Sequence, residues 1–326
     1  MKVETVDYHT AGEPFRIVTG GVPPLEGTTI LEKRRFAAER LDDVRRLLVY
    51  EPRGHADMYG CFVTEPEDDG ADLGVVFFHN AGYSTACGHG TIALVTWALD
   101  SGLLPGGAPE GEARVVVDVP SGRLETVARL EDSRVVAVRF RNVPSFVVAR
   151  DLETAGVSAD VSFGGAFYAS VEAPFAVEPG NLPRFIDLGR EVKHGLEAQR
   201  EFVHPLEPEL RDVYGVIFWQ AEEVGPPLVY RNVTVFADGE VDRSPCGSGT
   251  SARLALLDAD GELSRGAELL HRSVIGTEFR ARVVRDAEVD GVPAVVTEVE
   301  GSAHYTGRHE FALDPTDPLG EGFLLR

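Results

Sequence analysis

Short stretches of alternating or continuous apolar residues recur along the chain and predict a protein made mainly of β-strands. The strands predicted from this pattern are 3–8, 15–19, 61–64, 74–79, 115–117, 124–130, 135–140, 146–148, 164–169, 213–219, 232–236, 274–279, 281–284 and 295–299, with another ending the chain near Leu325. Residues 29–50 instead follow a helical period and begin with the capping-box pair Thr29 and Glu32, which predicts one long amphipathic helix. Its apolar face comprises Ile30, Ala37, Leu41, Val44 and Leu48. A further helix is expected within residues 180–199.

One motif occurs twice, about half a chain apart. The segments that begin at Cys87 and at Cys246 both follow the pattern Cys-Gly-x-Gly-Thr-x-Ala and continue into apolar sequence. Each then reaches a glycine at the same offset, Gly102 and Gly261. Each copy therefore predicts a helix with the cysteine motif at its N-terminal end and glycine at the C′ position. The duplication indicates two related halves.

The position of the motif suggests its chemistry. The first turn of a helix presents unpaired N–H groups and the positive end of the helix dipole, so we expect a cysteine there to have a lowered pKa. Glycines allow close approach of a ligand, and the N–H groups suit a carboxylate or a phosphate. Two such cysteines could remove a proton from one face of a carbon and return one to the other face, as racemases and epimerases do. The alternative is two ordinary helix starts with buried core cysteines.

Composition narrows the class of protein. The chain has 326 residues, enough for two domains, and a net charge of −22, which argues against nucleic acid or an anionic membrane as a partner. It has no apolar run of transmembrane length, and its first residues do not resemble a signal peptide. With only Cys61 besides the two motif cysteines, we expect a reducing, cytoplasmic location. Cys61 itself is expected in the core.

The residue inventory also bears on cofactors. The lysines are Lys2, Lys33 and Lys193; Lys33 belongs to a charged run on the predicted solvated side of a helix, and Lys193 has no phosphate-binding loop beside it. A pyridoxal enzyme, which needs a Schiff-base lysine, is therefore not expected. The histidines show no metal-binding spacing, so no metal is expected either. A cysteine hydrolase would leave the second motif unexplained.

Longer stretches resemble the proline racemase family. They are 7–14, 51–60, 82–93, 164–169, 236–240, 242–252 and 317–325, and they span nearly the whole chain. The resemblance implies an α+β fold like that of diaminopimelate epimerase, with two pseudo-symmetric domains, each a mainly antiparallel sheet around a central helix. The domains expected are 1–140 plus 308–326, carrying the Cys87 motif, and 141–307, carrying the Cys246 motif. The substrate would lie in the cleft, without a cofactor, and a homodimer is expected only because it is the commonest assembly among soluble oligomers.

The resemblance also implies roles for individual residues. Cys87 and Cys246 would be the acid–base pair, and Asp242 would pair with the substrate ammonium, although a helix cap is the alternative role for this aspartate. The remaining residues implied in substrate binding are the backbone N–H groups of Gly88, His89, Gly247 and Ser248, the side chain of His89, and the pocket walls Tyr59 and Phe236.

The implied reaction depends on the second acid–base position. Racemases and hydroxyproline 2-epimerases of the family are similar to this chain in having cysteine at both positions, whereas trans-3-hydroxy-L-proline dehydratases typically have threonine where Cys246 stands. Residues 77–84 and 301–307, with the Phe323–Leu325 end, look closer to the dehydratases. A racemase or 2-epimerase of proline or hydroxyproline is therefore expected, with the dehydratase as the alternative. A non-catalytic amino-acid-binding protein is the third hypothesis, against which both intact cysteines argue.

Overall fold

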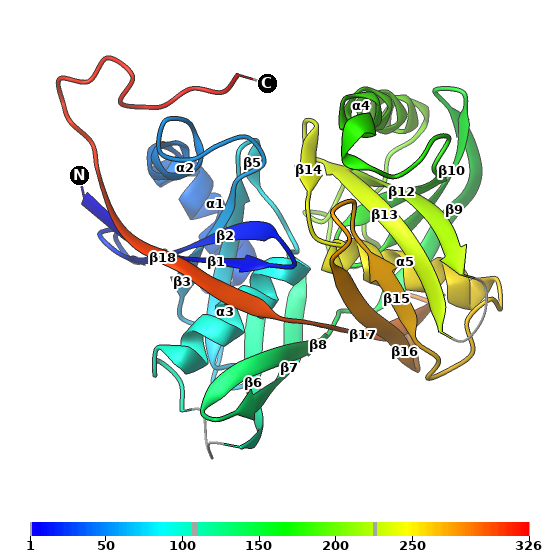
Figure 1. Ribbon diagram of the computed structural model, residues 1–326, viewed down its shortest axis with the longest axis horizontal. Coiled ribbons are helices and arrows are strands. Elements are labelled where there is room, and N and C mark those ends of the chain that lie inside the picture. The colour runs from blue at the N-terminus through cyan, green and yellow to red at the C-terminus, as the bar shows by residue number, and fades with distance from the viewer. Residues whose placement is uncertain (1, 106–109, 224–226, 326) are drawn as a thin grey trace. The chain divides into compact units, whose positions relative to one another are not determined.

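The computed structural model describes residues 2–105, 110–223 and 227–325, and the chain divides into two units (Figure 1). Unit 1 comprises residues 1–138 and 302–326, and unit 2 comprises residues 139–301. The boundary at 138/139 lies two residues before the one expected at 140/141, and the boundary at 301/302 lies six residues before the one expected at 307/308. The first one falls inside a continuous strand, β8 (Arg134–Arg141), where no change of composition marks it.

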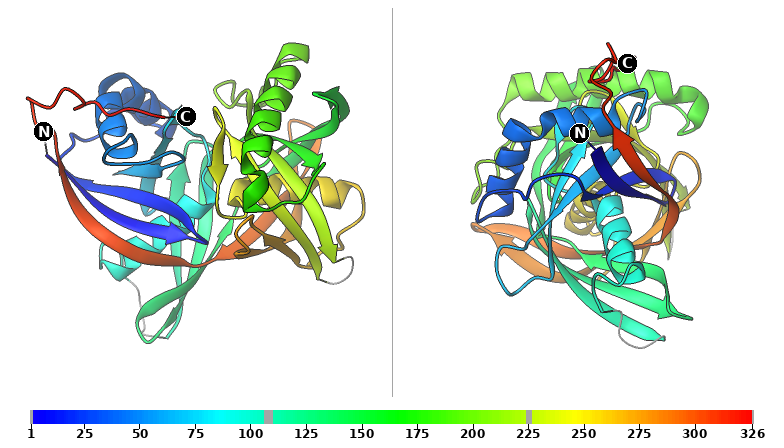
Figure 2. Two further views of the ribbon diagram at one scale, coloured as in Figure 1. Left: turned by 45° about the horizontal axis from the view of Figure 1, so that its top comes forward. Right: turned by 90° about the vertical axis from the view of Figure 1, so that its left-hand side faces the viewer.

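Strands of unit 1 form a mixed sheet. They are β1 (Lys2–Thr10), β2 (Glu13–Gly20), β3 (Tyr59–Thr64), β4 (Leu73–His79), β5 (Gly82–Tyr83), β6 (Gly111–Val119), β7 (Gly122–Glu131), the start of β8, and β18 (Ala303–Ala312). Strand β1 pairs antiparallel with β2, β2 parallel with β3, β3 antiparallel with β4, β4 parallel with β6, and β6 antiparallel with β7. On its other edge β1 pairs antiparallel with β18 along its whole length, from Lys2↔Ala312 to Thr10↔Ala303 (Figure 2).

Two helices stand where the sequence predicted one. Helices α1 (Ile30–Arg40) and α2 (Asp42–Val49) are separated at Leu41, whose backbone leaves the helical region at φ −127° and ψ 17°. Asp42 and Asp43 favour a new helix start there, because carboxylates in a first turn are stabilised by the helix dipole. The capping box of Thr29 and Glu32 is confirmed.

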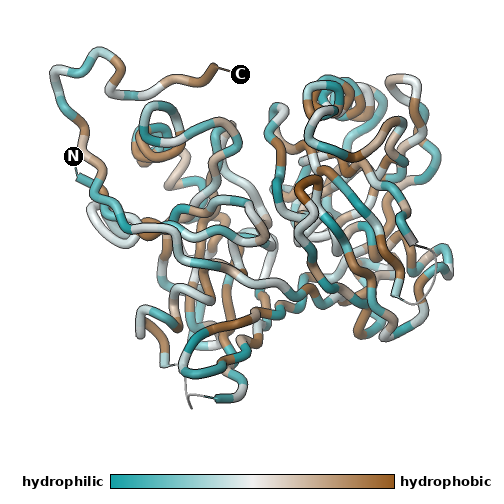
Figure 3. Tube along the Cα trace, in the orientation of Figure 1, coloured by the Kyte–Doolittle hydropathy of each residue, from teal (hydrophilic) through white to brown (hydrophobic). Residues whose placement is uncertain are grey.

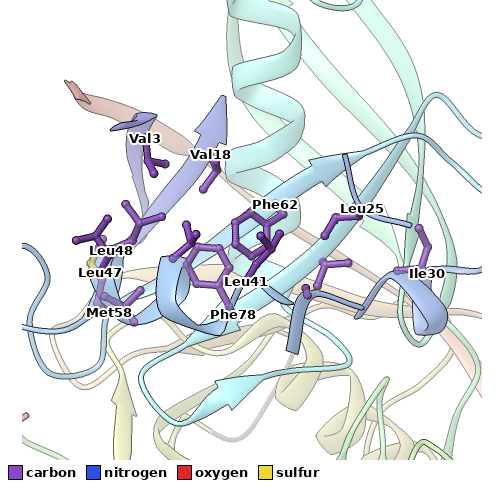
Figure 4. Close-up of a cluster of buried hydrophobic side chains, with 14 residues drawn as sticks. Val3, Val18, Leu25, Ile30, Leu41, Leu47, Leu48, Met58, Phe62 and Phe78 are labelled. Carbon is purple, nitrogen blue, oxygen red and sulfur yellow. The ribbon is translucent and has the colours of Figure 1, made fainter. Parts of the chain in front are cut away.

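Apolar side chains of these helices pack onto the sheet. Leu41 and Leu48 join Phe62 and Phe78, whose ring centroids lie 4.8 Å apart, in one buried cluster (Figure 4). The five positions predicted as the apolar face are all buried. The solvated position predicted for Lys33 is wrong: this side chain is 4% exposed and its Nζ donates to the carbonyl of Glu65 at 2.5 Å. A backbone acceptor takes the place of water for the buried ammonium.

Unit 2 repeats the order of pairings of unit 1. Its strands are β9 (Ser145–Thr154), β10 (Val157–Phe163), β11 (Phe167–Glu172), β12 (Val213–Glu223), β13 (Leu228–Phe236), β14 (Glu240–Asp242), β15 (Leu269–Arg272), β16 (Glu278–Val289) and β17 (Val292–Gly301). Antiparallel β10–β11, parallel β11–β12, antiparallel β12–β13 and parallel β13–β15 match the pairings from β1 to β6. Further antiparallel pairings, β15–β16, β16–β17, β17–β9 and β9–β10, close the strands into a ring.

Each unit holds one helix that begins at a motif cysteine. In α3 (Gly88–Asp100) residues 88–99 are buried, and in α5 (Gly247–Ala259) residues 247–257 are buried. A helix buried on all sides must lie inside its unit, because an amphipathic surface helix would expose one face. Both helices end as predicted, with Gly102 and Gly261 at φ +74° and +70°.

The remaining helices of unit 2 are η1 (Pro179–Asn181) and α4 (Leu182–Gln199), and α4 packs on β12 and β13 (Figure 1). Hydrophilic and hydrophobic residues succeed one another along the strands of both units (Figure 3). The predicted strand at the end of the chain is wrong. After β18 the chain has no further strand among the described residues, and Phe323 forms only an isolated bridge with Glu51.

Candidate active site

Cys87 caps the start of helix α3 in unit 1. Its backbone is extended, at φ −154° and ψ 99°, and its Sγ accepts a hydrogen bond from the N–H of Gly90 at 3.3 Å. A Cβ atom at Gly90 would lie 2.4 Å from the ring of Phe15 and 2.7 Å from this sulfur. Glycine is therefore required at position 90, and the helix end stabilises negative charge on the Cys87 sulfur.

The imidazole ring of His89 contacts the Cys87 thiol. Its Nε2 and Nδ1 lie 3.4 Å and 3.6 Å from Sγ, and its ring makes edge contacts with Phe15 and with Tyr59, at centroid distances of 5.7 Å and 5.0 Å. Burial lowers the pKa of His89 to about 3, so the ring is neutral at physiological pH. The Tyr59 hydroxyl donates to Ser84 Oγ. The structure thus brings three predicted site residues of unit 1 together: Cys87, His89 and Tyr59.

Cys246 starts helix α5 in unit 2 with a different backbone, at φ +64° and ψ 98°. A residue with a side chain rarely adopts a positive φ, and doing so costs about 1–3 kcal/mol. Cys246 N–H donates to Ser244 Oγ at 3.1 Å. A Cβ atom at Gly249 would approach the Cys246 sulfur and the Cδ1 of Ile217 to 2.9 Å each.

Tyr168 and Asp242 are among the polar groups near the Cys246 thiol. The thiol contacts the buried hydroxyl of Tyr168 at 3.8 Å, and this hydroxyl also lies 2.7 Å from Ser248 Oγ. Asp242 is 3% exposed and accepts a hydrogen bond from the N–H of Ser244 at 2.8 Å. Burial, with the N–H of Ser244 opposing it, raises the pKa of Asp242 to about 6.

The lowered thiol pKa expected from the helix end is wrong for Cys246. Burial and the nearby Asp242 carboxylate raise the pKa of Cys246 to about 12, outweighing the hydrogen bonds that favour a thiolate. The raised pKa favours the protonated form of the Cys246 thiol.

The other expected residues lie near these groups or in the core. Phe236, buried at the end of β13, stacks on Tyr214 at 5.7 Å, and Tyr214 makes an edge contact with Tyr168. The core position expected for Cys61 is confirmed, since it is 0% exposed and burial raises its pKa. Tyr168 was not predicted as a site residue, although it belongs to a stretch, 164–169, that carries the family resemblance. Only the fold shows that its hydroxyl reaches the second cysteine.

Comparison with known proteins identifies the family. The chain matches the family described as proline racemase over residues 5–324, and it belongs to that family of enzymes. It is 45% identical to a trans-3-hydroxy-L-proline dehydratase of Bacillus thuringiensis, covering 98% of this chain and 97% of that protein. It is 46% identical to a 3-hydroxyproline 2-epimerase of Burkholderia multivorans, covering 99% and 98%.

A solved structure has the same fold as this chain. The crystal structure of a hydroxyproline epimerase from Agrobacterium vitis, with bound trans-4-hydroxy-L-proline, superposes with a TM-score of 0.91 at 32% identity and covers 99% of this chain and 96% of that one. The fold is therefore that of the proline racemases. Within the described ranges, no helix has the length and apolarity needed to span a membrane, and no three His, Cys, Asp or Glu residues form a metal-binding group.

Proposed function

We propose that this protein is a two-cysteine racemase or 2-epimerase that inverts the α-carbon of proline or hydroxyproline. The observation that carries the proposal is that the buried central helix of each unit begins with a cysteine thiol, Cys87 in α3 and Cys246 in α5. A thiolate can act as a base near neutral pH, and a thiol can act as an acid. A hydroxyl in the second position could not act as a base there.

We assign the starting roles of the two thiols from the Asp242 carboxylate near Cys246, which disfavours a thiolate there. Cys87 Sγ accepts the N–H of Gly90 at the helix start, and we assign it as the thiolate that takes the α-proton. Cys246, with its pKa raised to about 12, delivers its own proton to the opposite face of the carbon. After one turnover Cys87 holds the proton and Cys246 is the thiolate, and the reverse reaction restores the first state.

Groups at the same helix starts would bind the charged groups of the substrate. The first N–H groups of a helix lack intrahelical acceptors, and in α3 and α5 these belong to Gly88, His89, Gly247 and Ser248. They would bind the carboxylate and stabilise the charge that builds up as the α-proton leaves. Asp242, ionised above a pH of about 6, would pair with the ring ammonium.

All three lysines hold hydrogen bonds or ion pairs. Lys2 pairs with Glu310 at 2.8 Å, Lys33 donates to the carbonyl of Glu65, and Lys193 donates to the carbonyl of Ala237 at 2.8 Å. Pyridoxal catalysis would require one of them to be released.

Dehydration of trans-3-hydroxy-L-proline is the second candidate, favoured by the name of the Bacillus thuringiensis relative at 45% identity. In that reaction the α-proton leaves as above, but the 3-hydroxyl then takes a proton from the acid of the site and departs as water. A C2–C3 double bond forms as the C–O bond breaks, so no second proton reaches the α-carbon.

Proton NMR in D₂O under reducing conditions separates the two reactions, with L-proline, trans-4-hydroxy-L-proline and trans-3-hydroxy-L-proline in separate tubes. We expect loss of the α-proton signal and growth of the other stereoisomer in at least one tube. Cys87→Ser and Cys246→Ser should abolish this, whereas Cys61→Ala, in the core, should retain it. Full turnover by both serine variants would refute the proposal. Loss of the ring protons of trans-3-hydroxy-L-proline with a new imine product would establish the dehydratase instead.

A further inference from the structure

The two motif cysteines share a sequence pattern but differ in backbone conformation. Cys87 is extended at φ −154°, as any residue can be, whereas Cys246 lies at φ +64°. A side chain is strained in this region, and the strain persists only where the surroundings hold the backbone in place. The φ angle also sets the direction of the Cα–Cβ bond and hence of the thiol. What holds Cys246 therefore bears on its chemistry.

Hydrogen bonds fix the peptide groups on both sides of Cys246. The carbonyl of Pro245 accepts from Asn232 Nδ2 at 3.2 Å and from Thr250 Oγ1 at 3.3 Å, and the N–H of the same peptide group donates to Ser244 Oγ at 3.1 Å. The carbonyl of Cys246 accepts from the N–H of Thr250 at 2.7 Å. Because the preceding and following peptide planes are both held, φ and ψ of Cys246 are held with them.

A buried histidine supports the threonine in this arrangement. His271, on β15, is 0% exposed, and its Nδ1 lies 2.7 Å from Thr250 Oγ1. Because the Thr250 hydroxyl donates to the Pro245 carbonyl, we assign the tautomer in which the Nδ1–H of His271 donates to Thr250. The Nε2 atom has no hydrogen-bond partner among the described residues, which agrees with this tautomer, since Nε2 then carries no buried N–H.

We propose that His271 is a positioning residue for the reaction, acting through Thr250 to hold the Pro245–Cys246 peptide and so to aim the Cys246 thiol. This inference rests on the proposed function in assigning Cys246 a role in proton transfer. The first motif is built differently. Its threonine, Thr91, donates directly to the carbonyl of Cys87 at 2.9 Å. Loss of His271 should therefore act on the second cysteine alone.

The test compares His271→Leu, which removes the ring donor, with His271→Asn, whose side-chain amide stands at the same number of bonds from Cβ as Nδ1. Thr250→Val and Thr250→Ser remove and keep the hydroxyl in the same way. Thr96→Val is the matched control, because Thr96 donates to the carbonyl of Ile92 in the middle of α3, away from either cysteine's backbone. Each variant is assayed for kcat and KM, and for iodoacetamide alkylation of Cys246 relative to Cys87 by peptide mass spectrometry.

We expect His271→Leu and Thr250→Val to lower kcat about 100-fold with little change in KM, because misplacing a reacting group by about 1 Å has an effect of that size. The alkylation ratio of Cys246 to Cys87 should rise in both as the thiol leaves its buried position. His271→Asn, Thr250→Ser and Thr96→Val should stay near the wild type in both measurements.

Two results would overturn the inference. One is an unchanged alkylation ratio in both His271→Leu and Thr250→Val; the other is a loss of kcat in His271→Asn as large as in His271→Leu. If His271→Leu does not fold, the Thr250 pair decides. The alkylation ratio needs no turnover. The wild-type protein could lack activity on every substrate while the alkylation ratio of Cys246 to Cys87 still rises in Thr250→Val. That result would refute the proposed function and leave the role of His271 in holding Cys246 intact.

Discussion

Replacing Asp242 with asparagine should make the protein more stable and less active. The side chain is 3% exposed, and burial raises the pKa of its carboxyl from 3.8 to about 6. A pKa difference of one unit corresponds to about 1.4 kcal/mol. The ionised Asp242 carboxylate therefore destabilises the folded state by about 3 kcal/mol above pH 6. Asparagine has nearly the same shape, keeps an oxygen that can accept the N–H of Ser244, and has no charge to desolvate.

The sign of the pH dependence follows from the raised pKa. A protonated Asp242 favours the folded state, and this contribution is complete below pH 3.8 and disappears as the pH rises to about 6. The wild-type protein should lose stability across that window relative to Asp242→Asn. The two proteins should be equally stable near pH 4 and differ by up to about 3 kcal/mol at pH 7–8.

Urea unfolding at pH 4, 5, 6, 7 and 8, monitored by a probe in unit 2, measures this difference in stability. Asp187→Asn is the control, because it removes the same charge from an exposed position on α4 and should track the wild type at every pH. α-Proton exchange by Asp242→Asn should fall by at least about 100-fold, as for loss of a buried charged partner. An Asp242→Asn protein that is less stable than the wild type at pH 8 would refute the reasoning, since it would mean that the ionised carboxylate stabilises the fold.

Three further changes test separate contacts. Tyr168→Phe removes the hydroxyl that contacts both Ser248 and Cys246. We expect kcat to fall about tenfold, the value of one hydrogen bond, with the midpoint of urea unfolding nearly unchanged. An unchanged kcat would show that Tyr168 has no role in the site. Gly90→Ala places a methyl group against the Cys87 sulfur. We expect the free energy of unfolding in urea to fall by about 2 kcal/mol and α-proton exchange to be lost. Normal activity would contradict the close packing at Gly90. Asp7→Asn leaves the buried Arg16 guanidinium without its charged partner at 2.7 Å and should cost about 3 kcal/mol of unfolding free energy. Equal stability would show that the carbonyls of Leu48 and Arg53, which accept hydrogen bonds from Arg16, suffice.

Local signals in the sequence predicted the local structure well. The Cys-Gly-x-Gly-Thr motifs and the glycines at 102 and 261 marked the starts and ends of the two buried helices, because caps depend on residues within a few positions of each other. The single long helix at residues 29–50 was wrong, since apolar periodicity continues across Leu41 although the hydrogen-bond ladder does not.

The electrostatic character of the site could not be derived in the same way. A helix start alone predicts a lowered thiol pKa, but Cys246 has a raised one because the fold buries it beside Asp242. The positive φ of Cys246, the contact with Tyr168 across 78 positions and the support from His271 depend on strand pairing that no short motif encodes. The burial of Lys33 was missed for the same reason, because its acceptor, Glu65, lies on another segment.

The pairing of β1 with β18 has a consequence for the order in which the protein folds during synthesis. Residues 2–10 are synthesised long before the strand that covers their outer edge, 303–312. Unit 2, which is continuous in sequence, can complete its ring of strands while β1 still exposes unpaired backbone groups, an arrangement prone to aggregation. We expect a released chain that ends after residue 301 to show a protease-resistant unit 2 and a cleavable unit 1, the reverse of the usual order in which the N-terminal part of a protein folds first.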